Sequence, residues 1–113
     1  RIASSVFLGR ERPDAVVGCN DLVAMGLMHE AKSLGLRIPE DVAITGFDNI
    51  PACRYVAPPL TTVEMRSEEM GEAAMQQVLS MIAGKGEQDS DILLEPRLVI
   101  RDSARRPAPQ PNG

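Results

Sequence analysis

The sequence has few lysines and no long apolar run. Lys32 and Lys85 are its only lysines, and 12 Lys+Arg against 16 Asp+Glu give 113 residues a formal net charge of −4. An acidic chain of this kind lacks the basic patch through which proteins bind nucleic acid phosphates. No apolar run is long enough to cross a bilayer. We therefore expect neither direct DNA binding nor membrane contact from this chain.

The scarcity of cysteine and histidine excludes further kinds of site. Cys19 and Cys53 lack the spacing of metal ligands, so we expect reduced thiols, as in cytoplasmic proteins. His29 has no partner at catalytic or metal-binding spacing. No Ser-His-Asp set, glycine-rich phosphate loop or pair of catalytic acids can be assembled. No signal peptide is visible after Arg1. The sequence predicts a cytoplasmic, non-enzymatic domain without metal or cofactor.

The best-defined pattern is a strand, a helix and a second strand. Residues 15–19 and 42–45 are short apolar runs typical of buried strands. Between them, residues 22–34 have helical spacing, with Asn20 or Asp21 at the N-cap and Gly35 at the C-cap. Such a unit of about thirty residues predicts parallel strands joined by a right-handed crossover.

The remaining elements extend this unit into an α/β lobe. The pattern predicts the end of a helix at 1–8, a strand at 60–63, a helix from Ser67 to Gly84 with Ser67 as N-cap, and strand-like runs at 92–94 and 98–100 at a sheet edge. We expect residues 104–113, which contain three prolines, to form a disordered tail. The predicted fold is a parallel-sheet, Rossmann-like lobe with helices on both faces, spanning residues 1–103.

The helix at 22–34 is apolar on nearly all sides. One stripe should pack on the sheet and consists of Ala24, Leu27, Ala31 and Leu34. Further apolar residues lie on other faces, namely Leu22, Val23, Met25 and Met28. A helix of this kind is buried on more than one side, so another part of the protein or a second subunit should cover it.

Two polar residues each follow a predicted strand. Because the carboxyl ends of parallel strands lie at one edge of the sheet, we expect Asn20 and Asp48 to lie near each other across a crevice. A carboxylate can accept hydrogen bonds from the vicinal hydroxyls of a sugar or ribose, and a carboxamide both donates and accepts. The alternatives are that Asp48 caps a turn and Asn20 caps its helix. Asp21 is interpreted as part of the helix terminus.

Three segments in this order also resemble a known family. They are PDAVVGCNDLVAMG at 13–26, GLRIPEDVAITGFDNI at 35–50 and PPLTTV at 58–63. They are similar to the effector-binding domain of the LacI/GalR family of bacterial transcription regulators. Met70-Gly71 and residues 98–103 fit the closing part of that domain, so the resemblance covers residues 1–103.

The resemblance implies a repressor whose two-lobed ligand domain is like that of periplasmic binding proteins. This chain would be most of the C-terminal lobe, and the helix-turn-helix that binds operator DNA would lie outside it. Asn20 and Asp48 match the effector contacts, and Met65 stands where several members carry Gln, which leaves the effector's identity open. Homodimer contacts implied by the resemblance and the apolar helix face are Leu22, Met25, Cys53, Tyr55 and Val56.

Two other functions fit parts of the pattern. A periplasmic sugar-binding protein of a transport system would share the lobe, but such a monomer would leave the Leu22 and Met25 face exposed. An enzyme could use Asp48 as a phospho-acceptor or general base, yet nothing supplies the metal-binding acids or the lysine that phospho-acceptor chemistry would require. The effector-binding domain of a regulator is therefore the favoured interpretation.

Overall fold

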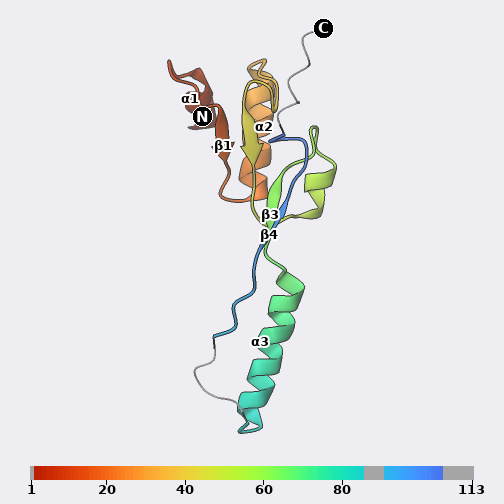
Figure 1. Ribbon diagram of the computed structural model, residues 1–113. Coiled ribbons are helices and arrows are strands. Elements are labelled where there is room, and N and C mark those ends of the chain that lie inside the picture. Colours follow the sequence, from red (N-terminus) through yellow and green to blue (C-terminus); the bar gives the residue numbers. More distant parts are fainter. Residues whose placement is uncertain (1, 86–90, 106–113) are drawn as a thin grey trace.

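The computed structural model describes residues 2–85 and 91–105, and Figure 1 shows an elongated molecule of 66 × 40 × 25 Å. Its elements, in chain order, are α1 (Ile2–Leu8), β1 (Ala15–Val17), α2 (Asp21–Ser33), β2 (Ala43–Thr45), the 3₁₀ helix η1 (Pro51–Arg54), β3 (Thr62–Glu64), α3 (Ser67–Ile82) and β4 (Arg97–Val99). Residues 106–113 of the predicted tail lie outside the described residues.

The predicted strand–helix–strand unit is confirmed. β1 pairs with β2 in parallel, with Val16 opposite Ile44, and α2 crosses between them and packs against β2. The chain beyond β2 then runs beside β3, because the Gly46 N–H donates to the Thr61 carbonyl at 2.9 Å. β4 pairs antiparallel with β3. Because β1 and β2 are parallel, their carboxyl ends lie at the same edge of the sheet, as expected.

The core lies between α2 and the strands. Ala24, Met28 and Ala31 of α2 are buried, together with Ile44 of β2 and Leu60. The prediction that Met28 lies on another face was wrong. Positions 24, 28 and 31 follow the i, i+4, i+7 spacing of one helical stripe, so the longer methionine side chain fills the core. Burying each large aliphatic side chain contributes about 1.5–3 kcal/mol.

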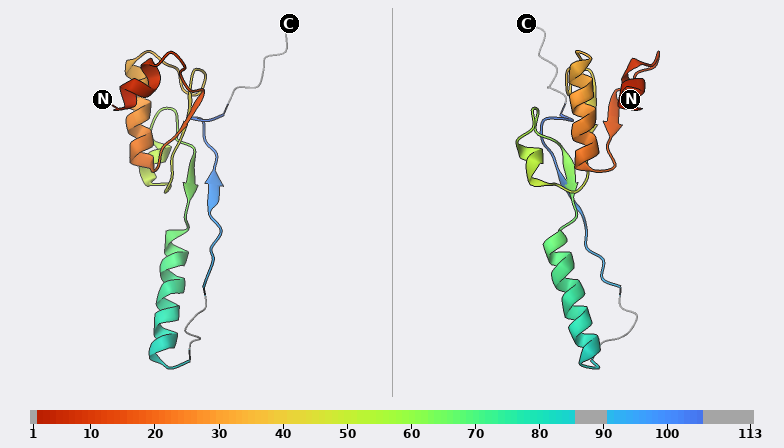
Figure 2. Two further views of the ribbon diagram at one scale, coloured as in Figure 1. Left: turned by 90° about the vertical axis from the view of Figure 1, so that its left-hand side faces the viewer. Right: turned by 180° about the vertical axis from the view of Figure 1, so that it is seen from behind.

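Helix α3 extends away from this core, as both views of Figure 2 show. None of its residues is buried, so it does not provide the second helical layer that the sequence predicted. Its N-cap is Arg66, not Ser67; Arg66 has a left-handed backbone (φ 54°) and its side chain pairs with Glu69. Residues 92–94, predicted as a strand, have no regular structure and lie along α3. The apolar stripe of α3 is thus exposed here.

An ion pair closes the turn that leads into β2, and it predicts a pH effect. The backbone N–H and Nε of Arg37 donate to Asp41 Oδ2 at 2.7 and 3.0 Å, and these bonds lower the pKa of Asp41 from 3.8 to about 2. A lowered folded-state pKa gives stability that is present above the unfolded pKa and is lost as the pH falls through the folded one. At neutral pH, the melting temperature of the intact wild-type protein should therefore exceed that of its Asp41→Asn variant. Thermal melts should show this difference in melting temperature disappear between about pH 5 and pH 2. A difference that does not vary with pH would contradict this.

Candidate functional site

Asp48 lies in a tight turn just beyond the carboxyl end of β2. Its side chain is exposed, and its backbone N–H donates to the Val63 carbonyl at 2.9 Å. The backbone of Asp48 has φ 119° and that of Asn49 has φ 61°. Left-handed conformations cost energy for residues other than glycine and gather at functional sites. The turn therefore presents the Asp48 carboxylate at the sheet edge in a defined, strained conformation.

Asn20 lies at the neighbouring strand end and caps α2. Its Oδ1 accepts a hydrogen bond from the Val23 N–H at 2.9 Å, which is the alternative role considered above. The next residue ties the two strand ends together, because the Asp21 N–H donates to the Phe47 carbonyl at 2.9 Å. The expected closeness of the two strand ends is confirmed. With Oδ1 engaged in the cap, Nδ2 is the Asn20 group that could donate to a ligand.

A polar hollow of about 350 Å³ opens beside Asp48. Its lining residues come from the turn after β2, from β3, from the start of α3 and from β4, and they are Asp48, Asn49, Glu64, Arg66, Ser67, Glu68, Glu69 and Arg97. The lining contains four carboxylates and two guanidinium groups, so hydrogen-bond acceptors predominate over donors. Such a surface suits a ligand rich in hydroxyl groups. Asn20 is not among the lining residues.

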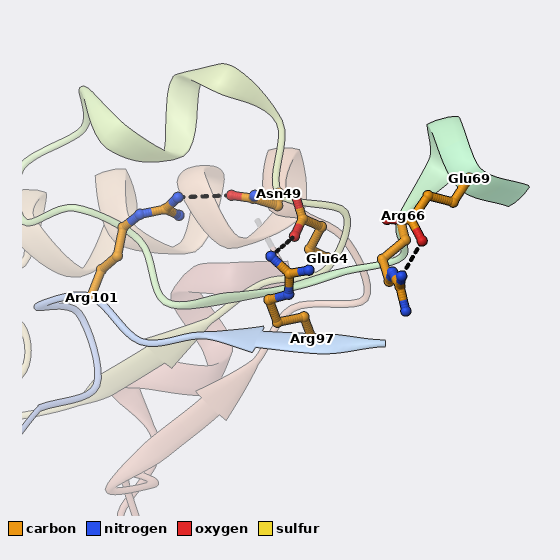
Figure 3. A network of polar contacts seen from close by, with 6 residues as sticks. All are labelled: Asn49, Glu64, Arg66, Glu69, Arg97 and Arg101. Atoms are coloured by element: carbon orange, nitrogen blue, oxygen red, sulfur yellow. Dashed lines mark hydrogen bonds and ion pairs between the residues drawn. The ribbon is translucent and has the colours of Figure 1, made fainter. Parts of the chain in front are cut away.

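A chain of polar contacts joins the turn to β3, to β4 and to Arg101 (Figure 3). Arg101 Nη2 donates to Asn49 Oδ1 at 2.8 Å, and Asn49 Nδ2 donates to Glu64 Oε1 at 3.3 Å. Arg97 Nη1 lies 3.6 Å from Glu64 Oε2. Sequence reasoning missed this network because Asn49 and Arg101 are 52 positions apart and no local spacing joins them.

Asp21 lies beneath the same turn and is only 1% exposed. Its Oδ1 accepts from the Thr62 hydroxyl at 2.5 Å and its Oδ2 from the Ile50 N–H at 2.8 Å. Burial alone would raise the pKa of Asp21, but hydrogen bonds from Thr62, Ile50, Cys53 and Asn49 outweigh it and lower that pKa. Asp21 is therefore an ionised, buried anchor, whereas the sequence indicated only a helix terminus.

The residues predicted to form a dimer contact divide into two groups. Leu22 and Tyr55 are 70% and 83% exposed. Met25 and Val56 are half-buried and line a groove between α2 and the loop after η1. Cys53, by contrast, is fully buried. Burial and the adjacent Asp21 carboxylate raise the pKa of its thiol to about 11. Cys53 is thus part of the core in this structure and does not contribute to the surface formed by the other four.

Within residues 2–85 and 91–105, no three His, Cys, Asp or Glu side chains are grouped so that they could hold a metal ion. The helices in that part of the chain are too short or too polar to cross a membrane.

Comparison with known proteins identifies the family. The model of the periplasmic binding protein-like domain matches residues 2–104. The HTH-type transcriptional repressor PurR of Vibrio vulnificus is 38% identical over 104 residues, which are 92% of this chain and 31% of that repressor. The chain belongs to the LacI/GalR family of periplasmic binding protein-like domains. It spans about a third of the length of the curated relatives it matches.

Solved structures of transcription regulators have the same fold. The transcription regulator GntR from Chromobacterium violaceum superposes with a TM-score of 0.84 at 31% identity, over 91% of this chain and 38% of that one. The LacI family transcriptional regulator from Arthrobacter sp. FB24, in complex with lactose, gives a TM-score of 0.83 at 32% identity, over 91% and 39% of the two chains. The predicted α/β class and the predicted family are both confirmed, and these relatives are transcription regulators.

Proposed function

We propose that this chain forms the effector-sensing part of a cytoplasmic transcriptional repressor and binds a sugar or nucleoside at Asp48 and Asn20. The observation that supports this most strongly is the exposed Asp48 carboxylate, held in a strained turn at the carboxyl edge of the sheet beside an acceptor-rich hollow. The names of the relatives also support a regulator, and one of them is a lactose complex. They do not favour the alternative of a periplasmic transport receptor.

The proposed chemistry uses hydrogen bonds to neighbouring hydroxyl groups. The two oxygens of Asp48 accept from two vicinal hydroxyls, and Asn20 Nδ2 donates to an oxygen of the same ligand. No bond is made or broken, so the proposed role is recognition, without catalysis and without a cofactor. An effector held between this lobe and a second one favours the closed state by its higher affinity for that state.

The exposed stripe of α3 supports a larger protein around this chain. Its apolar residues include Met75, Leu79 and Ile82, which are more than half exposed although they follow helical spacing. Exposed apolar patches of this kind mark surfaces that pack against other protein. We propose that α3 packs against the second lobe of the intact regulator, and that operator DNA is bound by a domain outside this chain.

We further propose that the regulator is a homodimer. Leu22 and Tyr55 are exposed, and the half-buried Met25 and Val56 line one groove between α2 and the loop after η1. A dimer related by a two-fold axis would bury this surface against its own copy. Effector-dependent closure of each subunit would then change the spacing of the two DNA-binding domains.

The site assignment is tested by Asp48→Ala in the intact protein. Losing hydrogen bonds to a charged acceptor should weaken effector binding by about 10- to 100-fold, measured by calorimetry with a panel of sugars and nucleosides that includes lactose, ribose and adenosine. Operator affinity without effector should not change, because the exposed Asp48 carboxylate is assigned to the effector alone. Glu40→Ala, which removes an exposed carboxylate from the turn before β2, is the control. Unchanged effector affinity in Asp48→Ala would overturn the assignment.

A further inference from the structure

The buried carboxylate of Asp21 is bonded to the segment that carries Asp48. Its Oδ2 accepts a hydrogen bond from the Ile50 N–H at 2.8 Å, where the turn after β2 ends and η1 begins. The Thr62 hydroxyl donates to its Oδ1 from β3 at 2.5 Å. Asp21 is the first residue of α2, so one carboxylate connects α2, β3 and the segment between β2 and η1. Each oxygen of this buried charge therefore has a donor.

The Ile50 N–H reaches Asp21 from a turn with an unusual backbone. Asp48 and Asn49 are consecutive residues with positive φ, at 119° and 61°. A non-glycine chain leaves such a conformation unless surrounding contacts hold it. A hydrogen bond from a backbone N–H to a buried carboxylate stabilises the backbone conformation that presents this N–H. The Asp21 bonds therefore favour the conformation in which Asp48 faces the hollow.

Gly46 lies against the Asp21 carboxylate. A Cβ at Gly46 would collide with Asp21 Oδ1 and would lie 3.1 Å from its Cα, so the glycine makes room for the carboxylate. The turn has a second anchor in Arg101, whose guanidinium donates to Asn49 Oδ1 at 2.8 Å. The turn is thus held by Asp21 through Ile50 and by Arg101 through Asn49.

We propose that Asp21 is a positioning residue for effector binding, which holds the Asp48–Asn49 turn in its binding conformation and joins it to the η1 loop that leads to Tyr55. This inference rests on the proposed function, since it assigns a role to Asp21 through Asp48. Asp21 itself touches no effector. Its hydrogen bonds stabilise the strained backbone conformation of the turn in the protein that has no effector bound.

Hydrogen–deuterium exchange in the intact protein tests this without any effector. Asp21→Asn should speed exchange of the hydrogen-bonded Asp48 and Ile50 amides by about tenfold or more, because the turn opens more often. Asp14→Asn, an exposed aspartate in the loop before β1, should have no effect. If Asp21 opposes backbone strain, its loss should matter less where glycine relieves that strain. Asp48→Gly relieves the strain at φ 119° and leaves the Asn49 contacts in place, so in this background Asp21→Asn should speed exchange of these amides by less than about threefold.

Equal effects of Asp21→Asn in the two backgrounds would overturn the inference, because a merely structural role in the core would not respond to Asp48→Gly. If Asp21→Asn does not fold, Thr62→Val takes its place, since it removes the hydroxyl that anchors Asp21 Oδ1. It should speed exchange of the same amides by about threefold, while Thr62→Ser, which keeps the hydroxyl, should match the wild type. No difference between these two variants would equally overturn the inference.

Effector affinity separates this inference from the proposed function. With the panel member that binds best, Asp21→Asn should weaken binding by about tenfold while Asp48→Ala weakens it at least as much. If Asp48→Ala weakens binding and Asp21→Asn does not, the inference fails and the proposed function stands. If Asp48→Ala has no effect, the proposed site fails, and the exchange result alone decides whether Asp21 holds the turn.

Discussion

Replacing Gly46 with alanine should lower the free energy of unfolding of the intact protein by about 3 kcal/mol or more. A Cβ at this position would collide with Asp21 Oδ1 and come within 3.1 Å of Leu60 Cδ2, and both of these residues are fully or almost fully buried. Relief of the collision requires Asp21 to move. That movement would break its bonds to Thr62 and Ile50 and leave a buried charge without its donors.

Chemical denaturation of the intact protein measures this effect. Gly9→Ala is the matched control, because a Cβ there meets only the Ser5 carbonyl oxygen, at an ordinary 3.7 Å. The control should lie within about 0.5 kcal/mol of the wild type. A Gly46→Ala variant as stable as the control would show that the Asp21 cluster can rearrange without cost, which contradicts the account given above.

Replacing Leu22 with aspartate should weaken dimerisation of the intact protein by about 100-fold or more. Leu22 is 70% exposed and lies beside Met25 on α2, in the surface proposed to meet a second copy. A carboxylate buried there at a dimer contact would lose its hydration and gain no partner. The variant should therefore be monomeric at concentrations where the wild type is a dimer.

Sedimentation equilibrium distinguishes the variants. Leu8→Asp provides the control, because Leu8 is 69% exposed but lies at the end of α1, outside the proposed dimer surface. It should leave the dimer intact. A dimer that survives Leu22→Asp, or one that is lost equally in Leu8→Asp, would place the subunit contact elsewhere on the protein.

The local elements could be predicted from the sequence because their signals are local. The apolar runs before Asn20 and Gly46 and the cap signals around α2 predicted β1, α2 and β2 close to their observed bounds. Their parallel pairing followed from chain connectivity alone, and it placed Asn20 and Asp48 at one edge.

Contacts between distant segments could not be predicted in this way. The partners of Asp21 lie 29 and 41 positions away, so the sequence indicated only its place at a helix terminus. The spacing of α3 predicted an apolar face, but periodicity does not state what covers that face, and here it extends away from the core. Met28 was misplaced because apolar residues nearly encircle α2, and only the packed structure shows which stripe faces the strands.

The most direct test of the proposed binding site is a crystal structure of the intact protein with its effector. It should place the ligand against this edge of the sheet, with two ligand hydroxyls donating to the Asp48 carboxylate at hydrogen-bonding distance and with the Asp48–Asn49 turn unchanged. A ligand bound elsewhere, with Asp48 still facing solvent, would contradict the assignment of this edge as the effector site.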